Sequence, residues 1–217
     1  SSRFAALTNV RNLQAPLGTL SRGLLVSDFL NSDATPEQFL QQLQPELSNY
    51  SPFNILLGDN EHLYYGNSAG DARELQPGIY GLSNAALDTP WPKTTELKRV
   101  LTNAMAETHD TPDLNALQKP IWQALANRIR APIEKLPTTG APLAIEEALS
   151  SAFVDFPEHQ YGTRCSTLLL ATRIEDVGGK TQSLQIQVEE RTHFQLRIDE
   201  LATSNTSVMK SFVLNID

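Results

Sequence analysis

The chain has 217 residues, of which 40% are apolar, and its 17 basic and 25 acidic residues give a net charge of −8 at pH 7. This composition excludes an intrinsically disordered chain, and 11 glycines and 13 prolines exclude a collagen-like or low-complexity one. The negative charge argues against broad binding to nucleic-acid phosphates, which requires a basic surface.

Short apolar runs bounded by turn residues predict several strands in the first ninety residues. A turn at 16–18 separates the first two runs, and residues 58–61 close a hairpin between the next two. The expected strands cover residues 4–10, 22–26, 53–57, 62–65 and 78–82.

One helix start stands between these strands. Thr35 has the chemistry of an N-cap, Pro36 suits the first helical position, and Gln38 closes a capping box. Apolar residues at helical spacing follow, and Pro45 is expected to kink or break the helix.

The middle of the chain predicts helices and its last part predicts strands. The expected helices cover 97–105, 114–117, 121–129 and 145–153, and Pro120, Pro132 and Pro137 divide them. The expected strands cover 165–172, 183–190 and 193–198, with a turn at 178–180. Strands grouped around a helical block predict an α+β fold, and we expect one domain over residues 1–217.

The cysteine and histidine content limits the chemistry of the chain. Cys165 is the single cysteine, which excludes an intramolecular disulfide and a cysteine-based zinc site and fits a reducing compartment, so we expect a cytoplasmic protein. Its place at the start of an apolar strand predicts a small buried side chain. The histidines lack metal-ligand spacing, so no metal site is expected; they are His62, His109, His159 and His193. No apolar run is long enough to span a membrane.

The negative charge is concentrated in residues 27–90. Arg73 is the single basic residue of this stretch, against nine acids, whereas the remaining basic and acidic residues balance. The stretch is either a solvated acidic face or a surface that repels anions or contacts a basic partner. The oxygen-rich alternation of a calcium loop is missing from it.

Polar side chains at strand ends are the candidates for chemistry. Asn9 and Asn84 each follow an apolar run, where an amide either donates to a developing oxyanion or ties off a turn. Arg164 precedes an apolar strand, where it either clamps a carboxylate or phosphate or pairs with Asp155 or Glu158.

Several of these runs closely resemble the transport-and-Golgi-organization family, also called the NRDE family. The resemblance follows the whole chain in order, and the pieces LSNAALDTPWPK and YGTRCST are its most specific parts. Compact loops make it more similar to a bacterial member than to an animal one. The matching runs are RFAALTNVR (3–11), SRGLLVSDFL (21–30), FNILLGD (53–59), LQPGIYGLSNAALDTPWPK (75–93) and YGTRCSTLLL (161–170).

The resemblance implies a fold similar to the N-terminal-nucleophile hydrolases, a four-layer αββα sandwich of antiparallel sheets. Family members begin with Met-Cys and an Asn-Arg-Asp-Glu motif, which this sequence lacks, so we expect a domain without its first strands. Ser1 does not stand at the nucleophile position of the family. Asn9, Asn84 and Arg164 are carried over as residues in supporting catalytic roles only.

The resemblance also implies a function in handling a ligand. The preferred expectation is haem trafficking, with haem as a transported small molecule and no required cofactor. One alternative is an amidohydrolase acting on a non-peptide C–N bond, with its nucleophile on the missing segment. The other alternative is a non-catalytic interaction domain. Because a domain without its first strands exposes sheet edges, the missing segment or a second copy of the chain is also an expected partner.

Overall fold

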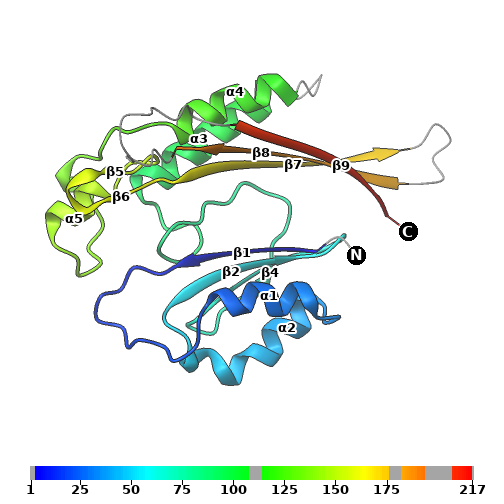
Figure 1. Ribbon diagram of the computed structural model, residues 1–217, viewed down its shortest axis with the longest axis horizontal. Coiled ribbons are helices and arrows are strands. Elements are labelled where there is room, and N and C mark those ends of the chain that lie inside the picture. The colour runs from blue at the N-terminus through cyan, green and yellow to red at the C-terminus, as the bar shows by residue number, and fades with distance from the viewer. Residues whose placement is uncertain (1–2, 108–113, 176–181, 194–206, 217) are drawn as a thin grey trace, which may run out of the picture. The chain divides into compact units, whose positions relative to one another are not determined.

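The computed structural model describes residues 3–107, 114–175, 182–193 and 207–216. Its helices and antiparallel sheets confirm the α+β class (Figure 1). The chain forms two compact units, an N-terminal unit of residues 1–152 and a C-terminal unit of residues 153–217. The expected single domain over 1–217 stays a prediction.

The N-terminal unit contains a four-stranded sheet in which each strand pairs antiparallel with the next along the chain. The hairpin expected at residues 58–61 is confirmed, because Gly58 pairs with Leu63 at its closed end. The strands are β1 (Phe4–Asn9), β2 (Phe53–Gly58), β3 (Leu63–Asn67) and β4 (Ala72–Glu74).

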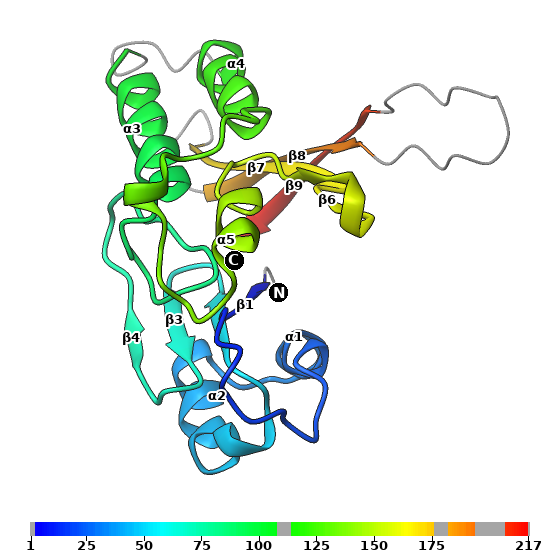
Figure 2. The same ribbon diagram turned by 90° about the vertical axis from the view of Figure 1, so that its left-hand side faces the viewer.

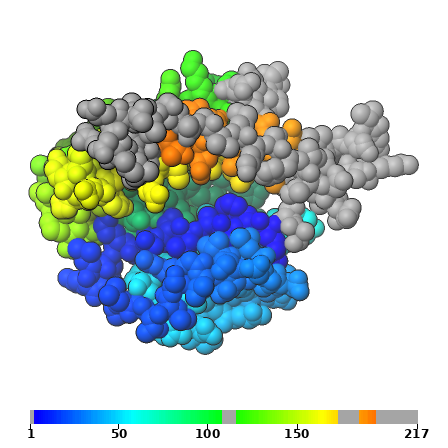
Figure 3. All heavy atoms as spheres, viewed as in Figure 1, coloured from blue at the N-terminus to red at the C-terminus, as the bar shows by residue number. Residues whose placement is uncertain are grey.

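Two short helices, α1 (Gly23–Asn31) and α2 (Pro36–Leu43), pack on this sheet and form an outer surface of the unit (Figures 1 and 3). The strand expected at 22–26 is therefore wrong. Leu25 and Phe29 lie four residues apart and are both buried, which is the spacing of a helical stripe. The core they join is built from α1, α2, β2 and the segment just before β2, and it consists of Leu25, Phe29, Leu40, Leu43, Tyr50, Phe53, Ile55 and Leu57.

The start of α2 is as the sequence predicts. The Thr35 side chain accepts from the Gln38 backbone, and the Gln38 side chain accepts from the Thr35 backbone. The α-helix ends at Leu43, and the 3-10 helix η1 (Gln44–Asn49) follows, which confirms the break expected at Pro45.

The rest of the N-terminal unit is helical and lies beyond a long loop. The helices are α3 (Pro92–Glu107), α4 (Leu114–Leu125), the 3-10 helix η2 (Ile133–Lys135) and α5 (Leu143–Ala148), with α3 and α4 packed together (Figure 2). Pro120 lies inside α4, so the division expected there is wrong; a proline removes one hydrogen bond without ending every helix. Residues 149–153, expected to continue the last helix, lie beyond the end of α5.

The strand expected at 78–82 is also wrong. These residues belong to an irregular loop over 75–91. Hydrogen bonds of side chains hold this loop in place, instead of the backbone hydrogen bonds that hold a strand in a sheet. The Tyr80 hydroxyl donates to the carbonyl of Gln76, for example, and the Gly81 N–H donates to the carboxylate of Asp88.

The C-terminal unit contains a three-stranded antiparallel sheet in the order β7-β8-β9. Cys165 is exposed on this sheet, so its expected burial is wrong: it shares a face of β7 with the exposed residues Thr167 and Leu169. The expected turn at 178–180, and all of the expected strand at 193–198 except His193, lie outside the described residues. The elements are β5 (Asp155–Phe156), the 3-10 helix η3 (Pro157–His159), β6 (Tyr161–Gly162), β7 (Cys165–Glu175), β8 (Gln182–Thr192) and β9 (Ser207–Ile216).

Candidate functional site

The segment 83–93 of the N-terminal unit is attached to the sheet at several points. The Asn84 side-chain amide donates to the carbonyl of Asn9 (2.9 Å), and the Arg11 backbone N–H donates to the carbonyl of Asn84 (2.7 Å). The Thr8 hydroxyl donates to the carbonyl of Ser83 (2.7 Å). The segment thus continues the sheet edge formed by β1 without being a strand.

A buried amide network on β2 and β3 also holds this segment on the sheet. Asn54 is fully buried, and its amide donates to the carbonyl of Ala85 (2.8 Å) and to the hydroxyl of Thr8 (3.1 Å). Its side-chain oxygen accepts from the Tyr65 hydroxyl (2.8 Å), which in turn accepts from the Leu87 N–H (3.3 Å). Burying these polar groups is tolerable because each is hydrogen-bonded, so the network fixes residues 85–87 over β2 and β3.

Asp88, in the middle of this segment, has a left-handed backbone conformation, with φ of 62°. Its carboxylate accepts from the Gly81 N–H (2.8 Å) and pairs with the Lys98 ammonium (2.5 Å). Partial burial raises the pKa of Asp88, but Lys98 and Gly81 outweigh it, so the pKa is lower than usual. A Cβ at Gly81 would lie 2.2 Å from the Thr94 methyl, so the loop approaches α3 more closely than other residues allow.

The fastened segment leads to a group of charged side chains around Trp91, here called the cationic cluster: Arg11, Trp91, Lys93 and Glu146. The Arg11 guanidinium lies 5.1 Å from the Trp91 ring centre, and its Nη1 is 2.5 Å from Glu146 Oε2. Glu146 is 2% exposed, and its Oε1 accepts from the backbone and the hydroxyl of Thr139. Both carboxylate oxygens therefore have partners inside the protein.

Lys93 is the less compensated cation of this cluster. Its Nζ donates to the carbonyl of Leu149, at the C-terminal end of α5 (3.1 Å), and lies 5.9 Å from the Trp91 ring centre. The pKa of Lys93 is lowered to about 8, because burial and the neighbouring Arg11 together outweigh the opposing effect of Glu146. Lys93 also stands in the first turn of α3, where the helix dipole disfavours a cation.

The cationic cluster is suited to bind an anion. It places two cations and one aromatic ring around a single carboxylate that is already hydrogen-bonded. Arginine recognises carboxylates through up to two parallel N–H bonds. The Trp91 ring is 8% exposed and supports the two cations from within, so the arrangement offers a positive site for a small molecule with a carboxylate.

The predicted site residues have different places in the structure. Asn9 and Asn84 are brought together, and the amide of Asn84 ties off the loop as a turn residue does. Arg164 belongs to the C-terminal unit and is exposed. Their supporting catalytic roles stay a prediction.

Sequence reasoning missed the cationic cluster. The signal available for part of it was Lys93 itself, a cation placed in the first turn of a helix two residues after a tryptophan. Glu146 gave no local signal, because it is 135 residues from its partner Arg11 in the chain.

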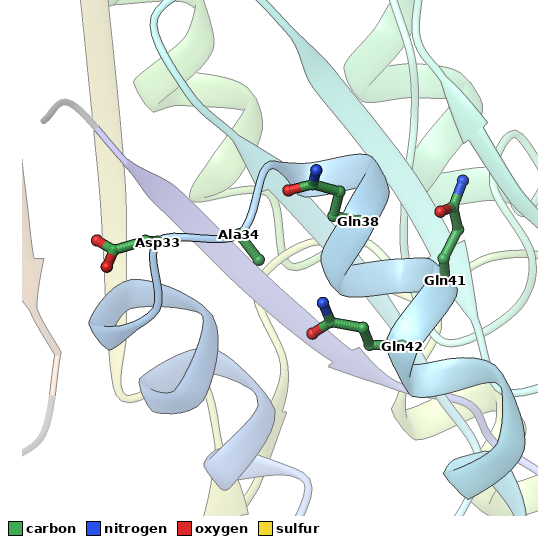
Figure 4. A pocket seen from close by; sticks show the side chains of 5 residues that line it. All are labelled: Asp33, Ala34, Gln38, Gln41 and Gln42. Atoms are coloured by element: carbon green, nitrogen blue, oxygen red, sulfur yellow. The ribbon is translucent and has the colours of Figure 1, made fainter.

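Two other features are weaker candidates. An open hollow of about 580 Å³ lies beside α2 (Figure 4), but Gln38 is used in the capping box and Gln41 donates to Glu37. The histidines His62 and His193 have hydrogen-bond partners of their own. His62 bonds Glu74, which raises its pKa, and His193 bonds Ser166. The hollow is lined by Asp33, Ala34, Gln38, Gln41 and Gln42.

Neither a metal-binding cluster nor a membrane-spanning helix is found among the described residues. Within residues 3–107, 114–175, 182–193 and 207–216, no group of three or more His, Cys, Asp or Glu side chains is placed to hold a metal ion. In the same ranges, every helix is too short or too polar to cross a bilayer.

Comparison with known proteins places the whole N-terminal unit in one sequence family. The family described as Transport and Golgi organisation 2 matches residues 1–184. The Transport and Golgi organization protein 2 homolog of Bos taurus is 32% identical over 180 residues, which cover 77% of this chain and 63% of that protein. The human homolog is 31% identical over 176 residues, with the same coverage, and the Drosophila melanogaster protein is 24% identical over 185. The match thus spans under two thirds of each relative's length.

Proposed function

The chain belongs to the Transport and Golgi organisation 2 family, and on that premise we propose that it is a ligand-handling protein. It holds a small carboxylate-bearing molecule at the cationic cluster. The ligand that the family resemblance suggests is haem, carried as cargo.

One observation carries this proposal: the cationic cluster has one more positive than negative charge and is partly shielded from water. Lys93 is half-buried, with a backbone carbonyl as its hydrogen-bond partner and with Arg11 close enough to lower its pKa. A buried cation without a full countercharge is costly, and that cost falls when an anion binds beside it. A carboxylate ligand therefore gains affinity from a charge that the folded protein already carries.

Haem fits this chemistry through its two propionates, which are carboxylates and suit Arg11 and Lys93. The Trp91 ring is 8% exposed, so it is not a stacking surface for the macrocycle. Of the described histidines, His62 and His159 are exposed and His193 belongs to the C-terminal unit. We therefore propose loose binding through the propionates, without a histidine axial ligand from the cationic cluster, as suits a molecule that must be released.

Haem titration of the purified chain tests the proposal. Following the Soret band should give a saturable change for the unaltered chain. Lys93→Met should weaken binding about tenfold, which corresponds to about 1.4 kcal/mol. Lys98→Met is the matched control, because Lys98 lies on the same helix and pairs with Asp88 outside the cluster. A flat titration, or equal affinities of the two variants, contradicts the proposal.

Amide hydrolysis is a second candidate, favoured by the lowered pKa of Lys93. An amine with a pKa near 8 can accept a proton close to neutral pH, as a general base must. The nucleophile would come from outside the described residues, in a fold like that of the N-terminal-nucleophile hydrolases; antiparallel sheets packed with helices support that proposed fold. Turnover of a panel of small amides that is lost in Lys93→Met, with haem binding absent, favours hydrolysis over transport.

We propose the cytoplasm as the place of action, on the support of the single cysteine. The expected partner is a small molecule rather than nucleic acid, as the net charge of −8 suggests. A non-catalytic interaction domain is the remaining alternative, and it predicts that neither haem nor amides respond to changes at Lys93.

A further inference from the structure

The position of Lys93 suits a chemical reaction with a bound molecule as well as the electrostatic attraction of an anion. We propose that its amine captures carbonyl compounds that carry a carboxylate, the class of 2-oxo acids, by forming an imine while the Arg11 guanidinium faces the carboxylate. This inference deepens the proposed function, because it uses the same cationic cluster and names a second class of ligand for it.

The geometry around Nζ suits a nucleophilic amine. Its hydrogen bond to the carbonyl of Leu149 (3.1 Å) uses an N–H and leaves the nitrogen lone pair of the neutral amine unused. That bond anchors the side chain between the first turn of α3 and the end of α5. The side chain is therefore oriented before any ligand arrives, which lowers the entropic cost of reaction.

Four influences set the fraction of Lys93 that is neutral. Burial, the neighbouring Arg11 and the N-terminal end of α3 all disfavour the ammonium, and Glu146 favours it. With a pKa of about 8, roughly a tenth of the amine is neutral at pH 7, compared with roughly one part in three thousand for an ordinary lysine. The reactive form is thus enriched about 300-fold.

The reaction balances without an oxidant or reductant. The lone pair of Nζ attacks the carbonyl carbon, a proton moves from nitrogen to the former carbonyl oxygen, and the carbinolamine then loses water to give the imine. One C–N double bond replaces one C–O double bond. The product keeps the carboxylate, which remains paired with Arg11.

Arg11 gives the preference for a carboxylate. Its side chain has five N–H donors, and its hydrogen bond to Glu146 uses Nη1. Arg11 and Lys93 lie 5.1 and 5.9 Å from the same Trp91 ring centre, so a carboxylate compound held at Nζ meets a second cation of the same cluster. A neutral aldehyde of the same size lacks that attraction.

The test traps the imine in the unaltered chain. The protein is incubated with glyoxylate and sodium cyanoborohydride, which reduces the imine to a stable amine, and the modified lysines are located by peptide mass spectrometry. We expect Lys93 to be labelled at least tenfold faster than Lys98 at pH 7.5, with a rate of imine formation that is half-maximal near pH 8 and levels off above it. Glyoxylate should label Lys93 faster than neutral acetaldehyde does.

Labelling of Lys98 at an equal or greater rate overturns the inference, as does an equal rate for the two aldehydes. Because both lysines are read in one molecule, misfolding of a variant does not enter the result. Failure here is distinguishable from failure of the proposed function: haem binding that depends on Lys93, without selective labelling, refutes covalent capture alone. Selective labelling without haem binding refutes haem as the ligand.

Discussion

Glu146→Gln should destabilise the N-terminal unit although it preserves the size and shape of the side chain. The glutamine oxygen can still accept from Thr139, but its amide group then faces the Arg11 guanidinium, donor against donor. The Arg11 side chain is 12% exposed, so its charge stays largely buried without a carboxylate.

The size of this effect follows from the burial of the pair. Breaking a buried ion pair by removing one partner costs about 3–5 kcal/mol, because the other charge remains buried. Contact of Arg11 with the Trp91 ring and its residual exposure place the expected loss near the lower end, at about 3 kcal/mol. For a domain whose free energy of unfolding is about 5–15 kcal/mol, such a loss is readily measured.

Urea unfolding followed by circular dichroism measures this loss, and Glu147→Gln is the matched control. Glu147 is the next residue of α5, but its side chain is 40% exposed and lies 3.8 Å from Arg130, so its replacement should cost under about 1 kcal/mol. A loss under about 1 kcal/mol for Glu146→Gln, or equal losses for the two variants, refutes the assignment of a buried ion pair at Arg11.

Three further predictions concern the pH dependence, the loop and the amide network. Because the pKa of Lys93 is lowered to about 8 in the folded state, the unfolded chain binds more protons above that pH; stability should therefore rise by about 2 kcal/mol between pH 8 and 9.5, and Lys93→Met should remove the rise in urea unfolding. Gly18→Ala should cost over about 3 kcal/mol in thermal unfolding, because its Cβ would lie 2.2 Å from backbone, whereas Gly23→Ala has 3.6 Å of room and should be neutral or stabilising. Tyr65→Phe should lose about 1–3 kcal/mol in chemical unfolding, because the buried Asn54 oxygen loses its donor; no loss would mean that water replaces the hydroxyl.

Local signals predicted those parts of the fold that local physics decides. The capping box at Thr35 and the hairpin at 58–61 depend on residues three or four apart, and both are as expected. The run at 22–26 was assigned wrongly because a five-residue apolar run does not distinguish a strand from the first turn of a helix. The burial of both Leu25 and Phe29 shows that the apolar residues recur at helical spacing. Burial depends on tertiary packing, so it could not be read from the five residues alone.

The site shows the same division more sharply. Asn9 and Asn84 could each be singled out because each follows an apolar run, but only the structure shows that one hydrogen bond joins them. The pair of Arg11 and Glu146 could not be predicted, since it depends on how a helix formed 135 residues later folds back. Salt bridges of this kind leave no periodicity and no fixed spacing in a sequence.

The contacts of the segment 83–93 explain why its loop residues, which form no regular secondary structure, have so specific a sequence. Ser83, Asn84, Ala85 and Leu87 each hold or are held by a group of the sheet, and Asp88 fixes the loop to α3. Together these contacts determine where Trp91 and Lys93 stand.

The distribution of charge completes this interpretation. Residues 27–90 carry nine acids against one arginine, and those acids include Asp59, Glu61 and Glu74, which surround His62, and Asp88, which neutralises Lys98. The stretch 27–90 therefore repels an anion, whereas the cationic cluster attracts one. A negative ligand is then directed to Arg11 and Lys93 by the repulsion of its surroundings as well as by the attraction of the site, and this selection should weaken as salt screens both.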